Sequence, residues 1–419
     1  MKYEMNAHAD SGGDANTYRD RFIINTAALL RSFGVGLMGV VLGIYLSRLG
    51  YSAFRIGVVV AVGLAGSALA TTAVGVAADR IGRKRFLTTL SLLTALGGLG
   101  LYASVNFSLL LVLTFLGMLN GTGTERSATY ALEQAVIPGL GADERRTWNL
   151  AVYNLLIDGG GALGALGAGL PLVLQHHFGF SLLNSYQLLF LAYSALYITV
   201  AGLYLQLSPV VEIAPNSIVS EAISAKTKKT IGKLTALFSL DAFGGGFLTD
   251  ALVSYWFFRR FGLSEQDLGL VFFVVHILNA VSHLGAAWLA SRIGLVNTMV
   301  FTHLPSSLLL MTVPFAPSTK VALALFFARE TLVEMDVPTR QSYVASLVHP
   351  SERSFASAVT NVARAACWAI GSAVAGVLMQ NLAFSAPLVA GGGTKITYDL
   401  LLYKLFRRLK PPEENYRHL

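Results

Sequence analysis

Residues Gly75-Val-Ala-Ala-Asp79-Arg80-Ile81-Gly82-Arg83-Lys84-Arg85 separate two apolar stretches of the chain. Within these eleven residues stand four cations, one carboxylate and two glycines. The flanking stretches, 54–77 and 86–105, are each long enough to cross the hydrocarbon core of a bilayer as a helix. The pattern therefore predicts a short charged turn that joins two membrane-spanning helices.

Composition places the whole chain in the same class. Its 419 residues are 54% hydrophobic and 13% charged, whereas a soluble domain carries about 25% charged residues. The net charge of +8 fits a cytoplasmic excess of Lys and Arg, and we expect no nucleic-acid partner. The one cysteine, Cys367, lies in an apolar run and excludes a disulfide framework. The polar residues 1–20 predict no cleaved signal peptide.

Apolar segments recur along the chain and predict twelve spans. They cover 22–47, 54–77, 86–105, 108–134, 148–172, 186–207, 233–257, 269–291, 296–316, 320–344, 355–379 and 384–406. The expected division is an N-terminal tail 1–21, a bundle 22–207, a linker 208–232, a second bundle 233–406 and a C-terminal tail 407–419. Lys and Arg gather in the segments that share a side with both termini, which predicts that both ends are cytoplasmic, in the inner or plasma membrane.

The two halves repeat one another in sequence. Arg31-Ser-Phe-Gly-Val-Gly36 matches Asp241-Ala-Phe-Gly-Gly-Gly246. Asp79-Arg80-Ile81-Gly82 matches Ser291-Arg292-Ile293-Gly294, at nearly the same separation along the chain. Such internal repeats are typical of secondary transporters. The second copy has lost the carboxylate, so the charged turn is expected to act in the first half only.

The charged turn resembles the signature loop between helices 2 and 3 of the major facilitator superfamily of secondary transporters. The positions that match, and that we predict to form a conformational latch, are Gly75, Asp79, Arg80, Gly82 and Arg83. The resemblance implies an all-α integral membrane protein whose twelve transmembrane helices form two pseudo-symmetric six-helix bundles around a central cavity. It further implies that Asp79 approaches the start of span 11, where a helix N-terminus attracts anions, with Arg83 helping to latch one state.

Charged side chains inside the spans are the candidates for binding and coupling, because such groups are costly in lipid and usually face a cavity or a partner. The residues predicted to serve the solute or the proton are Arg31, Glu125, Arg126, Asp158, Asp241, Arg329, Glu330, Glu334, Asp336 and Arg364. The repeat places Arg31 and Asp241 on opposite walls, where they form either a switchable pair or a static one. Arg329 with Glu330 is a coupling candidate or a neutralised structural pair. Lys395 and Asp399, four residues apart, are expected to neutralise each other.

The function predicted from these features is secondary transport. The sequence carries no nucleotide motif and no catalytic or metal constellation, so we expect no enzyme activity, no cofactor and an ion gradient as the driving force, with protons as the expected ion. Four arginines within spans favour an anionic or zwitterionic organic solute, although mid-span carboxylates also suit a cation. The glycine run 158–169 loosely resembles an antiporter motif and favours export. An uptake symporter or uniporter for a metabolite or metal chelate, and a non-transporting receptor of this fold, are the alternatives. We expect a monomer whose partners are the solute and the lipid bilayer.

Overall fold

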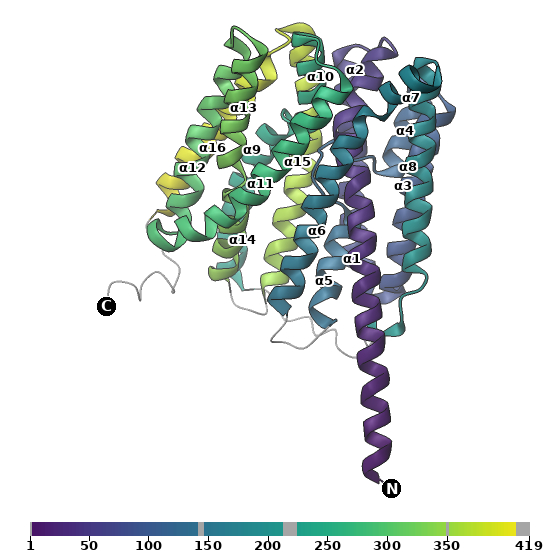
Figure 1. Cartoon of the computed structure of the whole chain (residues 1–419). Helices are drawn as coiled ribbons and strands as arrows, with labels where there is room; N and C mark the ends of the chain where they lie inside the picture. The colour runs from purple at the N-terminus through teal and green to yellow at the C-terminus, as the bar shows by residue number, and fades with distance from the viewer. Residues whose placement is uncertain (1, 141–145, 213–223, 349–351, 408–419) are drawn as a thin grey trace.

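The computed structural model describes residues 2–140, 146–212, 224–348 and 352–407. Within these ranges the chain consists of α-helices and short 3-10 turns, with no β-strand, and the helices run side by side as a bundle (Figure 1). Nine of the described helical stretches are long and apolar enough to span a membrane. The predicted all-α membrane fold is confirmed, and nine of the twelve predicted spans meet this criterion.

The helices fall into two sets that follow one another in the chain. The first set is α1 (Lys2–Arg48), α2 (Ala53–Ile81), α3 (Arg83–Ala103), α4 (Phe107–Gly117), α5 (Ala128–Val136), α6 (Arg146–Leu166), α7 (Leu170–Phe178) and α8 (Leu182–Tyr204). The second set is α9 (Ala225–Gly246), α10 (Asp250–Phe261), α11 (Glu265–Ile293), α12 (Leu295–Thr312), α13 (Thr319–Val333), α14 (Asp336–Ser346), α15 (Arg353–Asn381) and α16 (Ala386–Phe406). The N-terminal tail is helical and continues into the first span as α1.

The sequence repeat has a structural counterpart. The separation along the chain is the same from the start of α2 to that of α11, from α3 to α12 and from α4 to α13. Serine caps both α2 and α11, through Ser52 and Ser264. Gly82 and Gly294 end these two helices with positive φ angles of 119° and 88°, a conformation that only glycine adopts without strain. The predicted repeat is thus confirmed for these helices.

Three of the predicted spans are broken helices. The first is interrupted between α4 and α5, the second between α9 and α10, and the third between α13 and α14. Met118 ends α4 in the left-handed region (φ 51°), and Gly123 in the same segment has φ 75°. Non-helical backbone at membrane depth is tolerated where it is buried in protein or lines a cavity, so the breaks indicate where such a cavity lies.

The two halves meet closely at the end of the bundle remote from the 75–85 turn. Arg48 Nε of α1 forms an ion pair with Glu265 Oε1 of α11 (2.7 Å). The Phe54 backbone N–H donates to Gln380 Oε1 (3.2 Å), which joins the start of α2 to the end of α15. Ala251 N donates to Gly121 O (3.0 Å), so two of the helix breaks are hydrogen-bonded across the halves. The molecule is held together at this end.

The 75–85 turn makes its described contacts within the first half. Asp79 Oδ1 pairs with Arg83 Nε (2.8 Å), and the Asp79 side chain is 44% exposed. Glu212, after α8, accepts the backbone N–H groups of Arg83 (2.6 Å) and Lys84 (3.1 Å), as expected for an anion at a helix N-terminus. The predicted contact of Asp79 with span 11 falls on side chains 353–355, which lie outside the described ones. Much of the predicted linker (213–223) and of the C-terminal tail (408–419) also lies outside the described residues.

Candidate functional site

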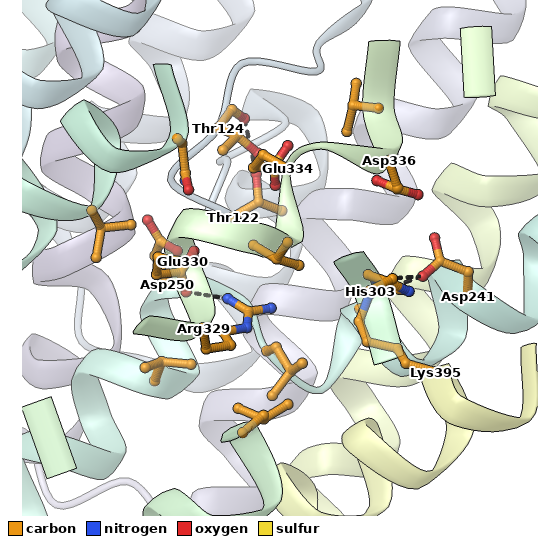
Figure 2. A pocket seen from close by; sticks show the side chains of 18 of the residues that line it. Thr122, Thr124, Asp241, Asp250, His303, Arg329, Glu330, Glu334, Asp336 and Lys395 are labelled. Atoms are coloured by element: carbon orange, nitrogen blue, oxygen red, sulfur yellow. Dashed lines mark hydrogen bonds and ion pairs between the residues drawn. The ribbon is translucent and has the colours of Figure 1, made fainter. Parts of the chain in front are cut away.

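A cavity lies at the junction of the broken helices (Figure 2). Its volume is about 70 Å³, which is room for several water molecules. Its polar lining residues are Thr122, Thr124, Arg126, Asp241, Asp250, His276, Asn279, His303, Arg329, Glu330, Glu334, Asp336, Arg340, Arg364, Trp368 and Lys395. Among the described residues, the first half contributes only the three from the α4–α5 segment, and the second half contributes the rest.

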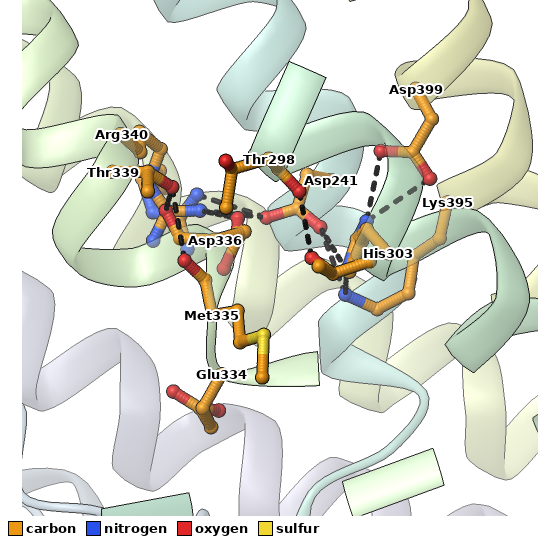
Figure 3. A network of polar contacts seen from close by, with 12 residues as sticks. Asp241, Thr298, His303, Glu334, Met335, Asp336, Thr339, Arg340, Lys395 and Asp399 are labelled. Carbon is orange, nitrogen blue, oxygen red and sulfur yellow. Dashed lines mark hydrogen bonds and ion pairs between the residues drawn. The ribbon is translucent and has the colours of Figure 1, made fainter. Parts of the chain in front are cut away.

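Asp241 of α9 is the centre of a buried charge cluster on the cavity wall (Figure 3). Its Oδ1 accepts from Lys395 Nζ of α16 (2.8 Å). Its Oδ2 accepts from Arg364 of α15 (3.0 Å) and from Arg340 of α14 (3.5 Å). Three cations from three helices therefore neutralise one carboxylate. Because buried charges persist only when they are paired and hydrogen-bonded, this cluster ties α9 to the rest of the second half.

His303 of α12 extends the cluster by linking two carboxylates. Its Nδ1 lies 3.0 Å from Asp399 Oδ1, and its Nε2 lies 3.8 Å from Asp241 Oδ1 and 3.3 Å from Lys395 Nζ. The prediction that Lys395 and Asp399 neutralise each other is wrong, because Lys395 turns to Asp241 and Asp399 to His303. His303 thus has a carboxylate near each of its ring nitrogens.

Two further ion pairs form within the second half. Arg340 also binds Asp336, one turn before it on α14. Arg329 pairs with its neighbour Glu330 on α13. The Asn279 amide of α11, in the orientation that satisfies both of its ends, donates to Glu330 Oε2 (3.3 Å). The predicted Arg329–Glu330 pair is thus present, on the cavity wall.

A cross-half ion pair joins Arg126 to Glu334. Arg126 precedes α5 by two residues and Glu334 precedes α14 by two, so the two occupy equivalent places in the repeat. Their charged atoms lie 3.8 Å apart. Residues related by a two-fold axis touch only near that axis, so this pair marks the centre of the interface. His283 of α11 lies 3.6 Å from the same carboxylate, and the Arg126 guanidinium stacks over Trp368 (4.8 Å).

Several polar atoms around the cavity have no partner among the described residues. They are Thr124 Oγ1, His276 Nε2, Arg329 Nε and Trp368 Nε1, all buried. Buried polar groups are nearly always hydrogen-bonded to protein, water or ligand. Because these four atoms come from four separate segments and line one cavity, they are available to a polar molecule that enters it.

Arg31, in contrast, lies away from the cavity. Its guanidinium bonds Glu133 Oε2 (2.6 Å) and lies 3.7 Å from Glu125. The hydroxyls of Tyr153 (2.7 Å) and Tyr204 (2.6 Å) complete the Glu133 carboxylate. Arg31 is 2% exposed and Glu133 is fully buried. The hypothesis of an Arg31–Asp241 pair is wrong for this conformation, since each residue has other partners.

Comparison with known proteins assigns the fold to a family. The family model described as Major Facilitator Superfamily matches residues 24–372. This chain belongs to the Major Facilitator Superfamily. The membership makes it a multi-pass membrane transporter and not an enzyme. A curated relative, the uncharacterized membrane protein YJR124C of Saccharomyces cerevisiae, is 26% identical over 93% of this chain and 94% of its own length.

Solved transporters of the superfamily share the architecture. A bacterial homolog of the human lysosomal transporter Spinster, inward-facing and occupied, superposes with a TM-score of 0.73 at 13% identity, covering 93% of this chain and 97% of the other. A D-xylose–proton symporter superposes with a TM-score of 0.71 at 14% identity, covering 92% of this chain and 97% of the other. At such identities the comparison shows the fold of the superfamily.

Most of the residues predicted for solute or proton lie together on the cavity wall of this superfamily member. They are Arg126, Asp241, Arg329, Glu330, Glu334, Asp336 and Arg364. Arg31 and Glu125 belong instead to the buried cluster of the first half. Asp158 of α6 is not a lining residue, and it lies within electrostatic range of His283 and Glu334.

Arg340 was missed by the prediction, and four further lining residues were recognised as charged or titratable groups within spans without being assigned to the site: Asp250, His276, His303 and Lys395. A signal for Arg340 was its spacing of four residues from Asp336, which places both on one helix face. His303 and Lys395 stand within predicted spans, but their partners come from other helices. Contacts between different helices cannot be predicted from the spacing of residues along one helix.

Proposed function

We propose that the protein is a proton-coupled secondary transporter that exports a small polar organic solute, anionic or zwitterionic, by alternating access. The observation that carries the proposal is the cavity between the halves, with paired charges and unpartnered hydrogen-bonding atoms on its wall. A purely apolar solute would leave those atoms unsatisfied, which is unfavourable. A polar solute forms hydrogen bonds with these atoms in place of water.

Rocking of the halves about the Arg126–Glu334 pair is the proposed motion. The pair lies near the pseudo-two-fold axis, and its 3.8 Å separation changes little when the halves rotate about a nearby line. Two contacts join the halves at the end remote from the 75–85 turn, Arg48–Glu265 and Phe54–Gln380. These contacts must break for that end of the protein to open. A cavity of about 70 Å³ must widen in the same motion to admit most organic solutes.

Proton coupling is proposed at Glu334 and His283. The Glu334 carboxylate is shared between Arg126 of the first half and His283 of the second, at 3.8 and 3.6 Å. Also within electrostatic range of the Glu334 carboxylate are Arg329, Asp158, Asp250, Glu330 and Arg340. A proton on His283 strengthens its attraction for Glu334 at the expense of Arg126, which loosens the contact between the halves. Imidazole is suited to this task because it titrates near neutral pH.

The proposed membrane and orientation follow from the distribution of charged residues among the loops. We place the chain in the inner or plasma membrane with both termini cytoplasmic, as the distribution of Lys and Arg favours, and we propose that it works as a monomer. The glycine run of α6 supports export only weakly, because Gly160 and Gly164 are accounted for by tight packing against the α1 backbone. Export and uptake are therefore separated by the direction of flux in the experiment.

The decisive experiment is transport by purified protein in liposomes that contain a pH-sensitive dye. Amino acids, hydroxy acids and dicarboxylates serve as solutes, with Glu334→Gln and Asp241→Asn as test variants. Asp267→Asn, an isosteric change in the exposed cap of α11, is the matched control. We expect solute-dependent proton flux in wild type and control, opposite in direction to the solute, and loss of that flux in Glu334→Gln.

The other outcomes distinguish the alternatives. Solute and proton moving in the same direction would establish an uptake symporter. Solute flux without proton movement would establish uniport or another coupling ion. Proton flux preserved in Glu334→Gln and lost in Asp241→Asn would move the coupling site to the Asp241 cluster. Absence of flux with every solute, together with the absence of any solute-induced rise in melting temperature, would contradict a transporter of polar organic solutes.

A further inference from the structure

The two ends of the cavity are lined by different charged residues. Figure 2 shows Asp250, Glu330 and Arg329 on one side, and Asp241, His303 and Lys395 on the other. The first end holds two carboxylates and one arginine. The second end holds the cations Arg340, Arg364 and Lys395 against the carboxylates of Asp241 and Asp336, while His303 and Asp399 form a pair of their own beside it. Among the lining residues, the first end therefore has one more carboxylate than cations, and the second end has one more cation than carboxylates.

Asp250 is the additional carboxylate at the first end. It is the first residue of α10, directly after the break in its span. Every other lining carboxylate has a cationic partner at ion-pair distance, and Asp250 has none among the described residues. Its carboxylate lies over Gly123, at which a side chain would collide with it. The lack of a side chain at Gly123 therefore leaves room for the Asp250 carboxylate.

His276 gives a second, independent indication of a ligand at this cavity. Its side chain on α11 is 6% exposed, it lines the cavity, and its Nε2 has no hydrogen-bond partner among the described residues. Asn279, three residues along the same helix, reaches Glu330. An unsatisfied buried imidazole nitrogen is expensive, and a ligand that offers N–H groups would satisfy it together with Asp250.

We propose that Asp250, Glu330 and His276 form an ammonium-binding end of the cavity, so that the solute is a zwitterion with its carboxylate at the Arg364–Lys395 end. The inference rests on the proposed function and narrows its solute class. Three N–H donors on an ammonium group match the carboxylate of Asp250, a Glu330 oxygen and the free nitrogen of His276. At the other end, Arg364 and Lys395 already hold the carboxylate of Asp241 and can share their donors with a second one.

The test uses pairs of solutes that differ only in the ammonium group. L-alanine is compared with L-lactate, and L-glutamate with L-2-hydroxyglutarate, in which a hydroxyl replaces the amine. Uptake into or release from liposomes is measured for wild type, Asp250→Asn, His276→Gln and the control Asp267→Asn. Solute-induced change in melting temperature reports binding and shows which variants fold. We expect wild type and control to prefer the amino member of at least one pair about tenfold or more, and Asp250→Asn to lose that preference, since a lost charged hydrogen bond is worth about tenfold or more.

The outcomes separate this inference from the proposed function. If wild type binds and transports both members of each pair equally well, the ammonium site is overturned, whereas the proposal of polar-solute transport is unaffected. A preference that survives in both Asp250→Asn and His276→Gln would assign the ammonium group elsewhere and overturn the inference. If Asp250→Asn fails to fold, His276→Gln alone decides, and an unchanged preference in it counts against the proposal. Failure of all four solutes to bind or move would overturn the zwitterion assignment, while dicarboxylate flux would still uphold the proposed function.

Discussion

Arg31 and Asp241 hold equivalent places in the repeat and have opposite environments. Arg31 of α1 pairs with Glu133 of α5, and Asp241 of α9 pairs with Arg340 of α14. Since α1 corresponds to α9 and α5 to α14, each cluster contains an ion pair between corresponding helices, with the charges exchanged. The Arg31 cluster is sealed by the hydroxyls of Tyr153 and Tyr204, whereas the Asp241 cluster lines the cavity.

We infer from this difference that the charge clusters of the two halves have different roles. In the first half, both oxygens of the Glu133 carboxylate are bonded inside the protein, which holds this pair in one geometry. A cluster on a cavity wall exchanges partners with water or a solute, because its cations have donors to spare. The first half contributes only the α4–α5 segment to the cavity. We therefore expect mutations in the Arg31 cluster to affect stability, and mutations in the Asp241 cluster to affect transport.

The largest expected effect is on stability, in Arg31→Met. The change leaves Glu133 charged, buried and without its cation, which costs about 3–5 kcal/mol of folding free energy. We expect a large fall in melting temperature and in the yield of folded protein. The double variant Arg31→Met with Glu133→Leu removes both charges and should recover more than half of the loss. Melting in detergent measures both.

Transport is the control for this prediction. The double variant should still move solute in liposomes once it is folded, because neither residue lines the cavity. A double variant that is stable and inactive would show that the Arg31 cluster takes part in transport, and the division between the halves would be wrong.

The second effect is on transport, in Asp241→Asn. Lys395, Arg364 and Arg340 lose their shared carboxylate, but Asp336 still holds Arg340 and the cavity can admit water. We expect a stability loss of about 1–3 kcal/mol, the penalty for a buried group left without its partner. Solute flux should fall at least about tenfold, corresponding to about 1.4 kcal/mol or more. Added anions should raise the melting temperature of this variant more than that of wild type.

A matching pair of changes tests whether the cluster acts through charge. Lys395→Met combined with Asp241→Leu removes one cation and the carboxylate together and should restore much of the stability. Flux is expected to stay low. If the double variant transports like wild type, the Asp241 cluster is structural like its counterpart in the first half.

A smaller effect is expected where the two halves meet, at Arg126 and Glu334. Arg126→Glu or Glu334→Arg brings like charges together at the pseudo-symmetry axis, and we expect solute exchange measured without a proton gradient to fall about three- to tenfold, equivalent to about 0.7–1.4 kcal/mol. The pair is 3.8 Å apart and its arginine side chain is 35% exposed, so solvent weakens the interaction. The double reversal should recover most of the flux. Liposome assays on the four proteins form a double-mutant cycle, and additive losses would show that the pair is not coupled.

The sequence was sufficient for the features that depend on local chemistry. Its charged turn, its apolar periodicity and its internal repeat specify the helices and the superfamily, because each can be recognised within contiguous stretches of the chain. Most of the predicted coupling residues do line the cavity, because a charge kept within a span needs a polar surrounding.

The ion-pair partners of the charged residues could be identified only from the structure. The repeat led to the wrong prediction that Arg31 and Asp241, opposite charges at equivalent positions, meet across the halves, because it gives no distance from the two-fold axis. Arg31 and Asp241 lie away from that axis, and Arg126 and Glu334 lie near it. The separation along the chain is also shorter between the starts of α5 and α14 than between the starts of α4 and α13. The longer break in the first half therefore hid the equivalence of Arg126 and Glu334 from a search at constant offset.

The smallest expected effect is at the charged turn, in Asp79→Asn. The ion pair of Asp79 with Arg83 is half exposed, and such pairs contribute about 0–1 kcal/mol. The melting temperature should therefore change by no more than that of the control Asp267→Asn. Its effect on transport comes from the balance of states, because the predicted contact of Asp79 with the start of α15 would favour the state in which that side of the protein is closed. We expect the rate of solute exchange to change about two- to fivefold, or about 0.4–1 kcal/mol, with the apparent solute affinity on the far side shifted in the same proportion. An unchanged rate and affinity with normal stability would show that the turn serves only to join α2 to α3.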